Sequence, residues 1–180
     1  MKIIAIQSSP NVKGLTSALA QAVLKGVKEK GGTIELVHLN NLNIKTCIAC
    51  ESGWGKCRTE GTCILQDDFT ALREKIAEAD SLIFATPVYW GDISESAKTF
   101  LDRLRRVESG LDFERFKGKK VIGITSAGGT GRGAVRALYN LEDYLRRVGF
   151  EIFDLVSVTR FSKDHKLLML QDAGRHLVEG

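Results

Sequence analysis

The stretch Lys2-Ile-Ile-Ala-Ile-Gln7 is followed at once by Ser8-Ser-Pro-Asn-Val-Lys-Gly-Leu-Thr-Ser17. The first part is an apolar, strand-like run, and a helix-like run from Leu15 to Lys30 begins near the end of the second. A polar loop at such a junction places backbone N–H groups at the positive end of a helix, where a phosphate binds well. The stretch therefore predicts a strand–loop–helix unit with a candidate anion site in its loop.

This loop carries hydroxyl and amide donors instead of the usual dinucleotide signatures. It has neither Gly-x-Gly-x-x-Gly nor Gly-Lys-Ser/Thr, which favours a single phosphate such as that of FMN. The neutral donors are Ser8, Ser9, Asn11, Thr16 and Ser17. An ordinary helix N-cap beside a turn uses the same residue types. On these residues alone, both interpretations stay open.

Strands and helices alternate along the rest of the chain. We expect further strands over residues 33–39, 81–86, 120–126 and 151–159. Further helices are expected after Asp67 or Asp68, over 94–107, up to about residue 147 and over 163–178. The run 81–86 is almost continuously apolar, as in a central strand covered on both faces. The pattern predicts an α/β fold, a flavodoxin-like doubly wound five-stranded parallel sheet of order 2-1-3-4-5 with helices on both faces.

Length and composition predict one domain over residues 1–180, with a cysteine-containing insertion loop at about 40–66. The net charge of +4 is modest and comes without a recognisable nucleic-acid module, so no nucleic-acid partner is expected. The longest apolar stretch, residues 81–89, is too short to cross a bilayer. The sequence opens directly into a strand, without the layout of a signal peptide, so we expect a cytoplasmic protein with no membrane partner.

Two further loops are expected beside the first, because ligands of such sheets bind beyond the carboxyl ends of the strands. The loop after the third strand offers a stiffening proline and an aromatic pair for a flavin ring, in Thr86, Pro87, Val88, Tyr89, Trp90 and Gly91. The loop after the fourth strand allows close approach of the backbone to a ligand, in Ser126, Ala127, Gly128 and Gly129. A subunit contact and a flexible helix start are the alternative interpretations of these two loops.

All four cysteines fall in one segment, at Cys47, Cys50, Cys57 and Cys63, with the spacing C-x2-C-x6-C-x5-C. Such clustering favours metal or redox chemistry over structural disulfides in a chain without export signals. Four thiolates suit an iron–sulfur cluster such as [4Fe-4S], or zinc. Zinc normally pairs two Cys-x-x-Cys knuckles, and the second is missing here. The third interpretation is free or redox-active thiols in a subunit-contact loop.

The order of these motifs resembles the NADPH-dependent FMN reductase and iron–sulfur flavoprotein group of flavodoxin-like proteins. The matching stretches span roughly residues 1–133: Ser8-Ser9-Pro10 with Thr16, Cys47-Ile-Ala-Cys50, Gly61-Thr-Cys63 leading to Asp67-Asp68, Ala79-Asp80, Thr86-Pro87-Val88-Tyr89 and Phe100-Leu101-Asp102-Arg103. The resemblance implies FMN, with its phosphate at Ser9, Asn11, Thr16 and Ser17, its ribityl chain and ring along Pro87, Val88, Tyr89 and Trp90, and Gly128 and Gly129 on the far side. Three departures are Asn11, where the group often has a basic residue, Leu15, where it often has a polar residue, and the wider gap between the second and third cysteines.

From this resemblance we expect an FMN-dependent oxidoreductase that takes electrons from NAD(P)H and passes them to an acceptor, with no catalytic acid or base. One alternative is an iron–sulfur flavoprotein that transfers electrons without oxidising NAD(P)H; a remote one is a non-enzymatic interaction module of the same fold. The resemblance also implies a homodimer or homotetramer, with the segments around Trp54 and Tyr89-Trp90 as candidate contacts. Outside the site, Asp67 or Asp68 is expected to cap a helix, and Asp102–Arg103 to form a helix-surface or subunit salt bridge.

Overall fold

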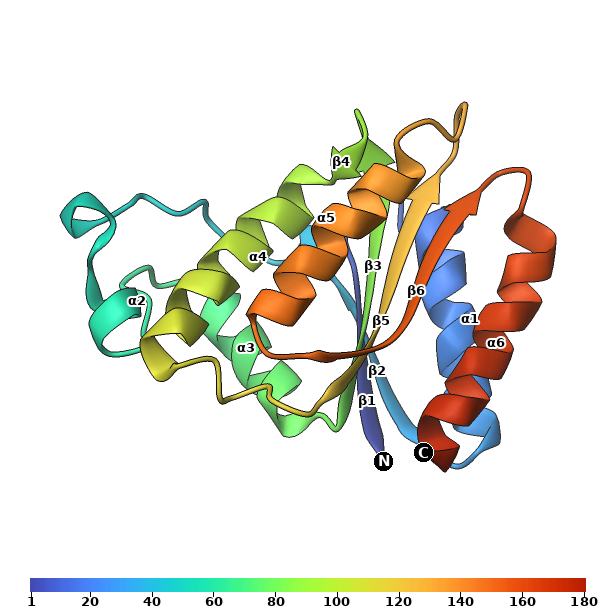
Figure 1. Ribbon diagram of the computed structural model, residues 1–180, viewed down its shortest axis with the longest axis horizontal. Coiled ribbons are helices and arrows are strands. Elements are labelled where there is room, and N and C mark those ends of the chain that lie inside the picture. Colours follow the sequence, from blue (N-terminus) through green and yellow to red (C-terminus); the bar gives the residue numbers. More distant parts are fainter.

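The computed structural model describes residues 1–180 and is built around a parallel sheet (Figure 1). Its five long strands are β1 (Lys2–Gln7), β2 (Thr33–His38), β3 (Ser81–Tyr89), β5 (Lys120–Ala127) and β6 (Glu151–Thr159). They lie in the order β2-β1-β3-β5-β6, and every neighbouring pair is parallel. The predicted doubly wound order is confirmed, because β5 and β6 are the fourth and fifth long strands along the chain.

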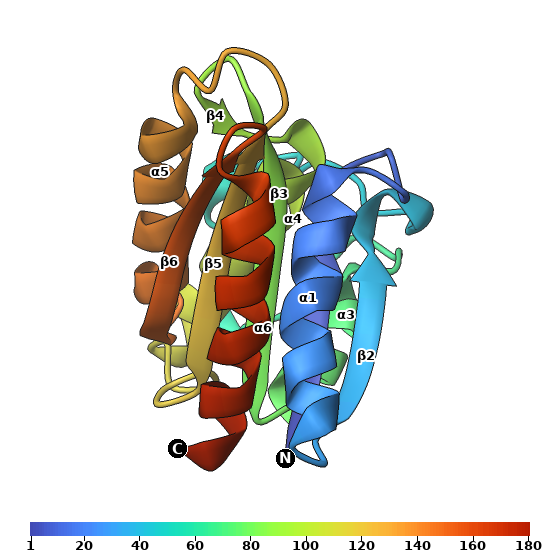
Figure 2. The ribbon, with the colours of Figure 1, turned by 90° about the vertical axis from the view of Figure 1, so that its right-hand side faces the viewer.

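Helices cover both faces of this sheet (Figures 1 and 2). One face carries α1 (Leu15–Glu29) and α6 (Lys163–Glu179), and the other carries α3 (Phe69–Glu78), α4 (Glu95–Glu108) and α5 (Ala134–Arg147). Each face has its own apolar core, of 15 buried residues beneath α1 and α6 and 22 beneath the other three helices. Alternation along each strand separates the two cores: Ile3 and Ala5 face α1, whereas Ile4 and Ile6 face the opposite side. None of the helices combines the length and apolarity needed to cross a bilayer.

The end of β3 differs from the expectation that residues 86–92 form a loop. β3 continues to Tyr89, and the short strand β4 (Asp92–Ile93) returns antiparallel against Val88 and Tyr89. Trp90 and Gly91 join the two strands with φ angles of 50° and 77°. Positive φ at both central positions is what a type I′ hairpin turn requires. The predicted aromatic loop is therefore a strand end closed by a tight turn.

Pro87 is compatible with this longer strand because no strand lies opposite it to accept a backbone N–H. Ala85 faces β1, since its carbonyl accepts the backbone N–H of Ser8 at 3.0 Å. Backbone groups alternate along a strand, so Pro87 faces the same side. β1 pairs with β3 only as far as Ala85, and no strand stands opposite Pro87 on that side.

The segment between β2 and α3 holds all four cysteines and contains only short helical turns. These are η1 (Leu39–Asn41), η2 (Glu51–Gly53) and α2 (Lys56–Thr59), and η3 (Ser109–Leu111) follows α4 beside them. Figure 1 shows the segment reaching away from the sheet, next to one end of α4. Cys57 and Cys63 pack against the apolar core on this face, which anchors the segment to the domain.

Candidate functional site

The three predicted loops meet at one edge of the sheet. The strand register places Gln7 opposite Ala85, and Pro87 opposite Ser126. The hydroxyl groups of Thr16 and Ser126 lie 2.8 Å apart, which ties the start of α1 to the end of β5. These contacts bring the loop after β1 to the same edge of the sheet as the hairpin turn and the loop after β5. The loop after β1, residues 8–17, is called the phosphate loop below.

The first turn of α1 leaves its backbone N–H groups without protein partners. Gly14 is the N-cap, and no side chain caps the helix. The first helical hydrogen bond runs from the Ala18 N–H to the Gly14 carbonyl at 3.1 Å. The amides of residues 15–17 therefore have no acceptor within the helix. The interpretation of this loop as a side-chain N-cap is wrong, and its amides are free for an anion.

Two of the five predicted phosphate-binding side chains are used inside the protein. The fully buried Ser8 hydroxyl accepts a hydrogen bond from Ser94 Oγ at 2.9 Å and lies 3.4 Å from the Ala85 carbonyl oxygen. Ser17 is also fully buried and accepts a hydrogen bond from Gln21 Nε2 at 3.0 Å. These two hydroxyls shape the loop, although the backbone N–H of Ser17 stays free.

The other three side chains keep donors for a ligand. Ser9 Oγ accepts the Asn11 N–H at 3.2 Å and retains its own proton. Asn11 Oδ1 accepts the Lys13 N–H at 3.2 Å, which leaves the Asn11 amide NH₂ group free. Thr16 and Ser126 share one hydrogen bond, so one hydroxyl proton of that pair remains. The loop thus combines free amides with neutral side-chain donors.

Gln7 and His38 belong to the same edge, and neither was identified as a site residue from the sequence. The fully buried Gln7 side chain donates from Nε2 to the Ser9 carbonyl at 3.0 Å and accepts the Ser9 N–H at Oε1 at 2.8 Å. Gln7 Nε2 also lies 2.6 Å from His38 Nδ1. The signal in the sequence was a polar amide at the last position of an otherwise apolar strand.

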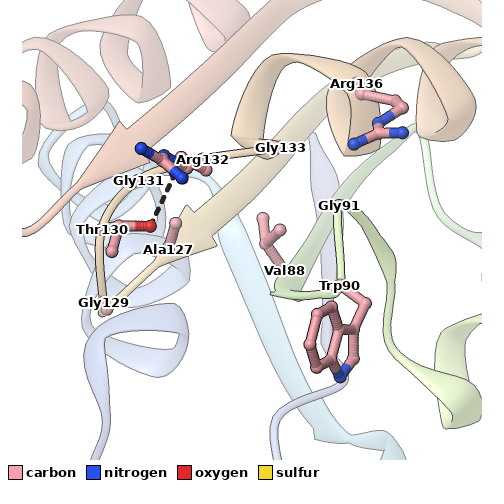
Figure 3. A pocket seen from close by; sticks show the side chains of 11 residues that line it. Val88, Trp90, Gly91, Ala127, Gly129, Thr130, Gly131, Arg132, Gly133 and Arg136 are labelled. Carbon is pink, nitrogen blue, oxygen red and sulfur yellow. Dashed lines mark hydrogen bonds between the residues drawn. The ribbon is translucent and has the colours of Figure 1, made fainter.

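A hollow of about 400 Å³ opens beside the phosphate loop, between the hairpin turn and the loop after β5. We call it the glycine hollow; its lining is Val88, Trp90, Gly91, residues 127–133 and Arg136. Figure 3 shows Val88, Trp90 and Gly91 on one side and the loop around Thr130 and Arg132 on the other. Its volume lies within the range of about 300–1,000 Å³ found for small-molecule sites.

Three of the predicted ring-contacting residues lie behind this lining. Thr86 is fully buried, and its hydroxyl accepts the Ser94 N–H at 3.1 Å. Ser126 is engaged with Thr16, and Pro87 is buried within β3. Tyr89 is exposed and also does not line the hollow. Six predicted residues do line it: Val88, Trp90, Gly91, Ala127, Gly128 and Gly129.

Arg136, on the first turn of α5, is a lining residue that the sequence did not reveal. A Cβ atom on Gly91 would stand 2.8 Å from its Nη2 atom, so the guanidinium packs against the hairpin turn. A Cβ atom on Gly133 would stand 2.4 Å from Gly91 Cα, so two glycines let the two loops touch. Neither Arg132 nor Arg136 forms a side-chain hydrogen bond or a salt bridge within the chain. The glycine hollow therefore carries two uncompensated positive charges.

The four cysteine side chains surround a second, smaller hollow, called the cysteine hollow below. Cys47, Cys50, Cys57 and Cys63 line it together with Ile48, Ile64, Leu65, Arg103, Arg106 and Val107. All four thiols are free. Desolvation raises the pKa of the Cys50 thiol, and the other three thiols and Glu51 raise it further.

The geometry does not single out one interpretation of these cysteines. No three His, Cys, Asp or Glu side chains meet closely enough to hold a metal ion. The cysteine hollow is lined mainly by apolar side chains, and its volume of about 20 Å³ is close to that of one water molecule. A cluster, zinc and free thiols therefore all stay open as interpretations.

Arg103 lies beneath the cysteine hollow, not on the helix surface as expected. It is 1% exposed, and its two Nη atoms donate to the carboxylate of Asp67 at 2.6 and 3.0 Å. Asp102 instead pairs with Lys98 on the same helix at 3.2 Å. Arg103 falls on the inward face of α4, where a guanidinium needs an internal carboxylate. The prediction for Asp102–Arg103 was wrong because it missed this partner.

The acidic pair stands at the start of α3 as expected, but its side chains bond mainly to other segments. Asp68 occupies the N-cap position, but its side chain makes no cap bond and accepts the Asn43 N–H at 2.7 Å. Asp67 Oδ1 accepts the Phe69 N–H at 3.2 Å, beside its ion pair with Arg103. Both acids therefore connect the cysteine segment to the domain.

Comparisons with known proteins point to one family. A family model described as NADPH-dependent FMN reductase matches residues 1–161. An iron–sulfur flavoprotein of Methanocaldococcus jannaschii is 31% identical over 78% of this chain and 70% of its own length. Another, of Archaeoglobus fulgidus, is 35% identical over 58% of this chain but 46% of its own length. The structure of an NAD(P)H:quinone oxidoreductase from Methanothermobacter marburgensis is 25% identical with a TM-score of 0.72, covering 98% of this chain and 96% of that one.

These matches, together with the sheet order, support FMN binding and an FMN-dependent oxidoreductase. The chain belongs to the NADPH-dependent FMN reductase family.

Proposed function

We propose that this protein holds FMN across the sheet edge, with the phosphate at the phosphate loop and the flavin ring in the glycine hollow. The observation that carries the proposal is the uncapped first turn of α1, which contacts Ser126, the residue directly before the lining of that hollow. The Thr16–Ser126 contact at 2.8 Å joins the two parts. An FMN molecule would need both parts, because its phosphate and ring stand at opposite ends of the ribityl chain.

The free amides of residues 15–17, with Ser9 and Asn11, bind the phosphate through neutral donors and the helix dipole. Val88 and Trp90 offer apolar surface to the ring, and the amides of residues 127–129 offer hydrogen bonds to its polar edge. Arg132 and Arg136 supply positive charge on the same side, which favours negative charge on the ring. FMN, when bound, supplies the hydride chemistry, so none of these residues needs to act as acid or base.

We infer that the electron donor is NAD(P)H, as the description of the family indicates. Two unpaired guanidinium groups at the mouth of the glycine hollow attract the phosphates of a dinucleotide. Trp90 is fully exposed at the same mouth, so a second aromatic ring has a surface on which to pack. The acceptor would use the same open mouth after the nicotinamide leaves.

Two measurements on the purified protein test this proposal. The visible spectrum should show bound flavin, and extraction should release FMN. Rapid mixing with NADPH or NADH without oxygen should bleach the flavin absorbance. A protein without FMN and without affinity for it contradicts the site. Bound flavin that neither nucleotide bleaches contradicts the NAD(P)H reaction and leaves electron transfer from another donor.

A second candidate function is that of an iron–sulfur flavoprotein, and its support is the names of the relatives together with the grouping of the four cysteines. The four thiols share one apolar space, and the relatives described above carry that name. A bound cluster would supply one-electron transfer next to the flavin domain. Iron and acid-labile sulfide should then be present in protein purified without oxygen. Full FMN content without iron would contradict this candidate.

We also infer that copies of this chain associate as a homodimer or homotetramer. Trp90, Val135 and Tyr139 are exposed apolar side chains on the hairpin turn and the facing helix α5. Together they form an apolar border beside the glycine hollow. Light scattering behind a sizing column measures the mass directly, and a monomer at micromolar concentration would contradict the inference.

A further inference from the structure

The turn that joins β6 to α6 carries an arginine and a phenylalanine side by side. The Thr159 N–H donates to Ser162 Oγ at 3.0 Å, and the Ser162 N–H donates to the Thr159 carbonyl at 3.1 Å. These bonds close a β-turn with Arg160 and Phe161 at its two central positions. The backbone of both residues is therefore held in place, and the segment is called the 159–162 turn below.

Both central side chains are exposed to solvent. Phe161 is 72% exposed, whereas five of the other seven phenylalanines are buried. Arg160 stacks on this ring, with its Cζ atom 4.6 Å from the ring centroid, and it forms no side-chain hydrogen bond or salt bridge within the chain. Residues 160–166 hold three lysine or arginine residues against one acid. The turn therefore presents an open aromatic ring beside uncompensated positive charge.

The 159–162 turn lies directly beside the lining of the glycine hollow. Thr159 pairs with Ala127 across neighbouring strands, and the Arg160 N–H donates to the Ala127 carbonyl at 3.2 Å. A Cβ atom on Gly131 would stand 2.9 Å from Thr159 Cγ2, so the loop after β5 packs against the turn. Figure 2 shows the β6–α6 connection at the same end of the sheet as that loop and the start of α1. Since Ala127 and Gly131 both line the hollow, the turn stands one strand spacing, about 4.8 Å, beyond it.

We propose that the 159–162 turn binds the adenosine end of the NAD(P)H dinucleotide, with the adenine stacked on Phe161 and a phosphate beside Arg160. The inference rests on the proposed function, because the nicotinamide of the same molecule must reach the flavin ring in the glycine hollow. Purine rings stack on aromatic and guanidinium planes, and this turn offers both. Arg132 directly follows Gly131, which touches the turn, so a dinucleotide that leaves the hollow towards β6 has a second guanidinium group beside its phosphates.

Reduced nicotinamide mononucleotide separates the two ends of the dinucleotide, because it carries the nicotinamide but no adenosine. Full-length protein with bound FMN is mixed rapidly with NADPH or with the mononucleotide at rising concentrations, without oxygen. The dependence of the bleaching rate on concentration gives an apparent Kd for each reductant. Phe161→Ala should raise the apparent Kd for NADPH about tenfold relative to that for the mononucleotide, because one base–aromatic stack is lost.

Two further variants separate the ring from its surroundings. Leu168→Ala is the matched control, because Leu168 is 71% exposed on α6 but offers no ring, and both apparent Kd values should stay as in wild type. Arg160→Gln removes the charge of the turn, so its apparent Kd for NADPH should depend less steeply on salt than that of wild type. Bound FMN reports that each variant is folded.

Adenosine 2′,5′-bisphosphate tests the same surface without any reaction, since it carries the adenosine end and no nicotinamide. Calorimetry should show that it binds FMN-loaded wild type and binds Phe161→Ala about tenfold more weakly. Equal apparent Kd values for NADPH in wild type and Phe161→Ala, or equal losses for NADPH and the mononucleotide, would overturn the role of the turn, while bleaching by NADPH keeps the proposed function. FMN-loaded wild type that neither reductant bleaches would overturn the NAD(P)H reaction and the inference with it.

Discussion

The side chain of Gln7 forms two hydrogen bonds with the backbone of Ser9, one through each end of its amide, at 3.0 and 2.8 Å. These bonds fix which end carries the NH₂ group, so that group also faces His38 Nδ1 at 2.6 Å. An NH₂ group only donates, and His38 Nδ1 must therefore accept. One buried amide thus links the end of β2 to the phosphate loop.

Gln7→Leu should weaken FMN binding about tenfold while leaving riboflavin binding unchanged. Leucine removes both bonds to Ser9, and a loss of about 1.4 kcal/mol corresponds to that factor. Fluorescence titrations with FMN and with riboflavin measure the two affinities, and their comparison isolates the phosphate because riboflavin lacks only that group. Gln21→Leu is the control, because it removes the bond to Ser17 within the same helix. Equal losses for both flavins would mean that Gln7 supports the whole domain instead.

Thr16→Ala should also weaken FMN binding, and its effect should depend on Ser126. The two hydroxyls lie 2.8 Å apart and share a hydrogen bond. If this bond joins the phosphate loop to the glycine hollow, Ser126→Ala alone should cost part of the same affinity. A double-mutant cycle should give a coupling of about 0.5–1.5 kcal/mol. Strictly additive losses would show that the two loops bind FMN independently.

Trp90→Gly should make the free protein more stable and its FMN site weaker. Trp90 has a φ of 50° and is 104% exposed, so its side chain contributes almost no packing in return for its backbone strain. Glycine relieves that strain, which is worth about 1 kcal/mol. Thermal unfolding and flavin titration measure the two effects. Trp54→Gly is the control, because Trp54 is 69% exposed with a φ of −115° and should gain no stability.

The sequence was sufficient for the sheet because that architecture depends on local patterns. Apolar runs, glycine stops and alternating elements predicted five parallel strands in the observed order. The end of β3 was missed because Pro87 was assigned to a loop after the strand, and only the length of β1 shows that a backbone N–H is dispensable there. Arg103 was misplaced because its partner Asp67 lies far away in the sequence. Long-range polar pairs leave little local signal, and the Gln7–His38 contact escaped notice for the same reason.

Gly128→Ala should reduce flavin affinity without changing the stability of the free protein. A Cβ atom on Gly128 meets no atom within 4 Å, so the substitution touches nothing but a ligand. Gly133→Ala is the matched contrast: its φ is 78° and its Cβ atom would lie 2.4 Å from Gly91 Cα. That variant should unfold at lower temperature as well as bind flavin poorly. If Gly128→Ala binds FMN as wild type does, the ring does not approach this glycine.

The Asp67–Arg103 ion pair should make stability depend on pH in the acid range. Burial by itself raises the pKa of Asp67, but hydrogen bonds from Arg103 and from the Lys45 and Phe69 amides lower it below the ordinary 3.8. A lowered pKa in the folded state means that stability is complete above about pH 4 and is lost as the pH falls through the folded value.

Asp67→Asn should therefore cost about 3–5 kcal/mol at pH 7, because it leaves the buried Arg103 without a carboxylate. The deficit should shrink below pH 4, where wild type loses the same contribution. Urea unfolding at several pH values between 7 and 3 measures the free energy of unfolding of wild type and of the variant. Asp102→Asn, in the exposed pair with Lys98, should cost at most about 1 kcal/mol. A deficit of the same size at both ends of the range would mean that Asp67 stabilises the fold through shape and not through its charge.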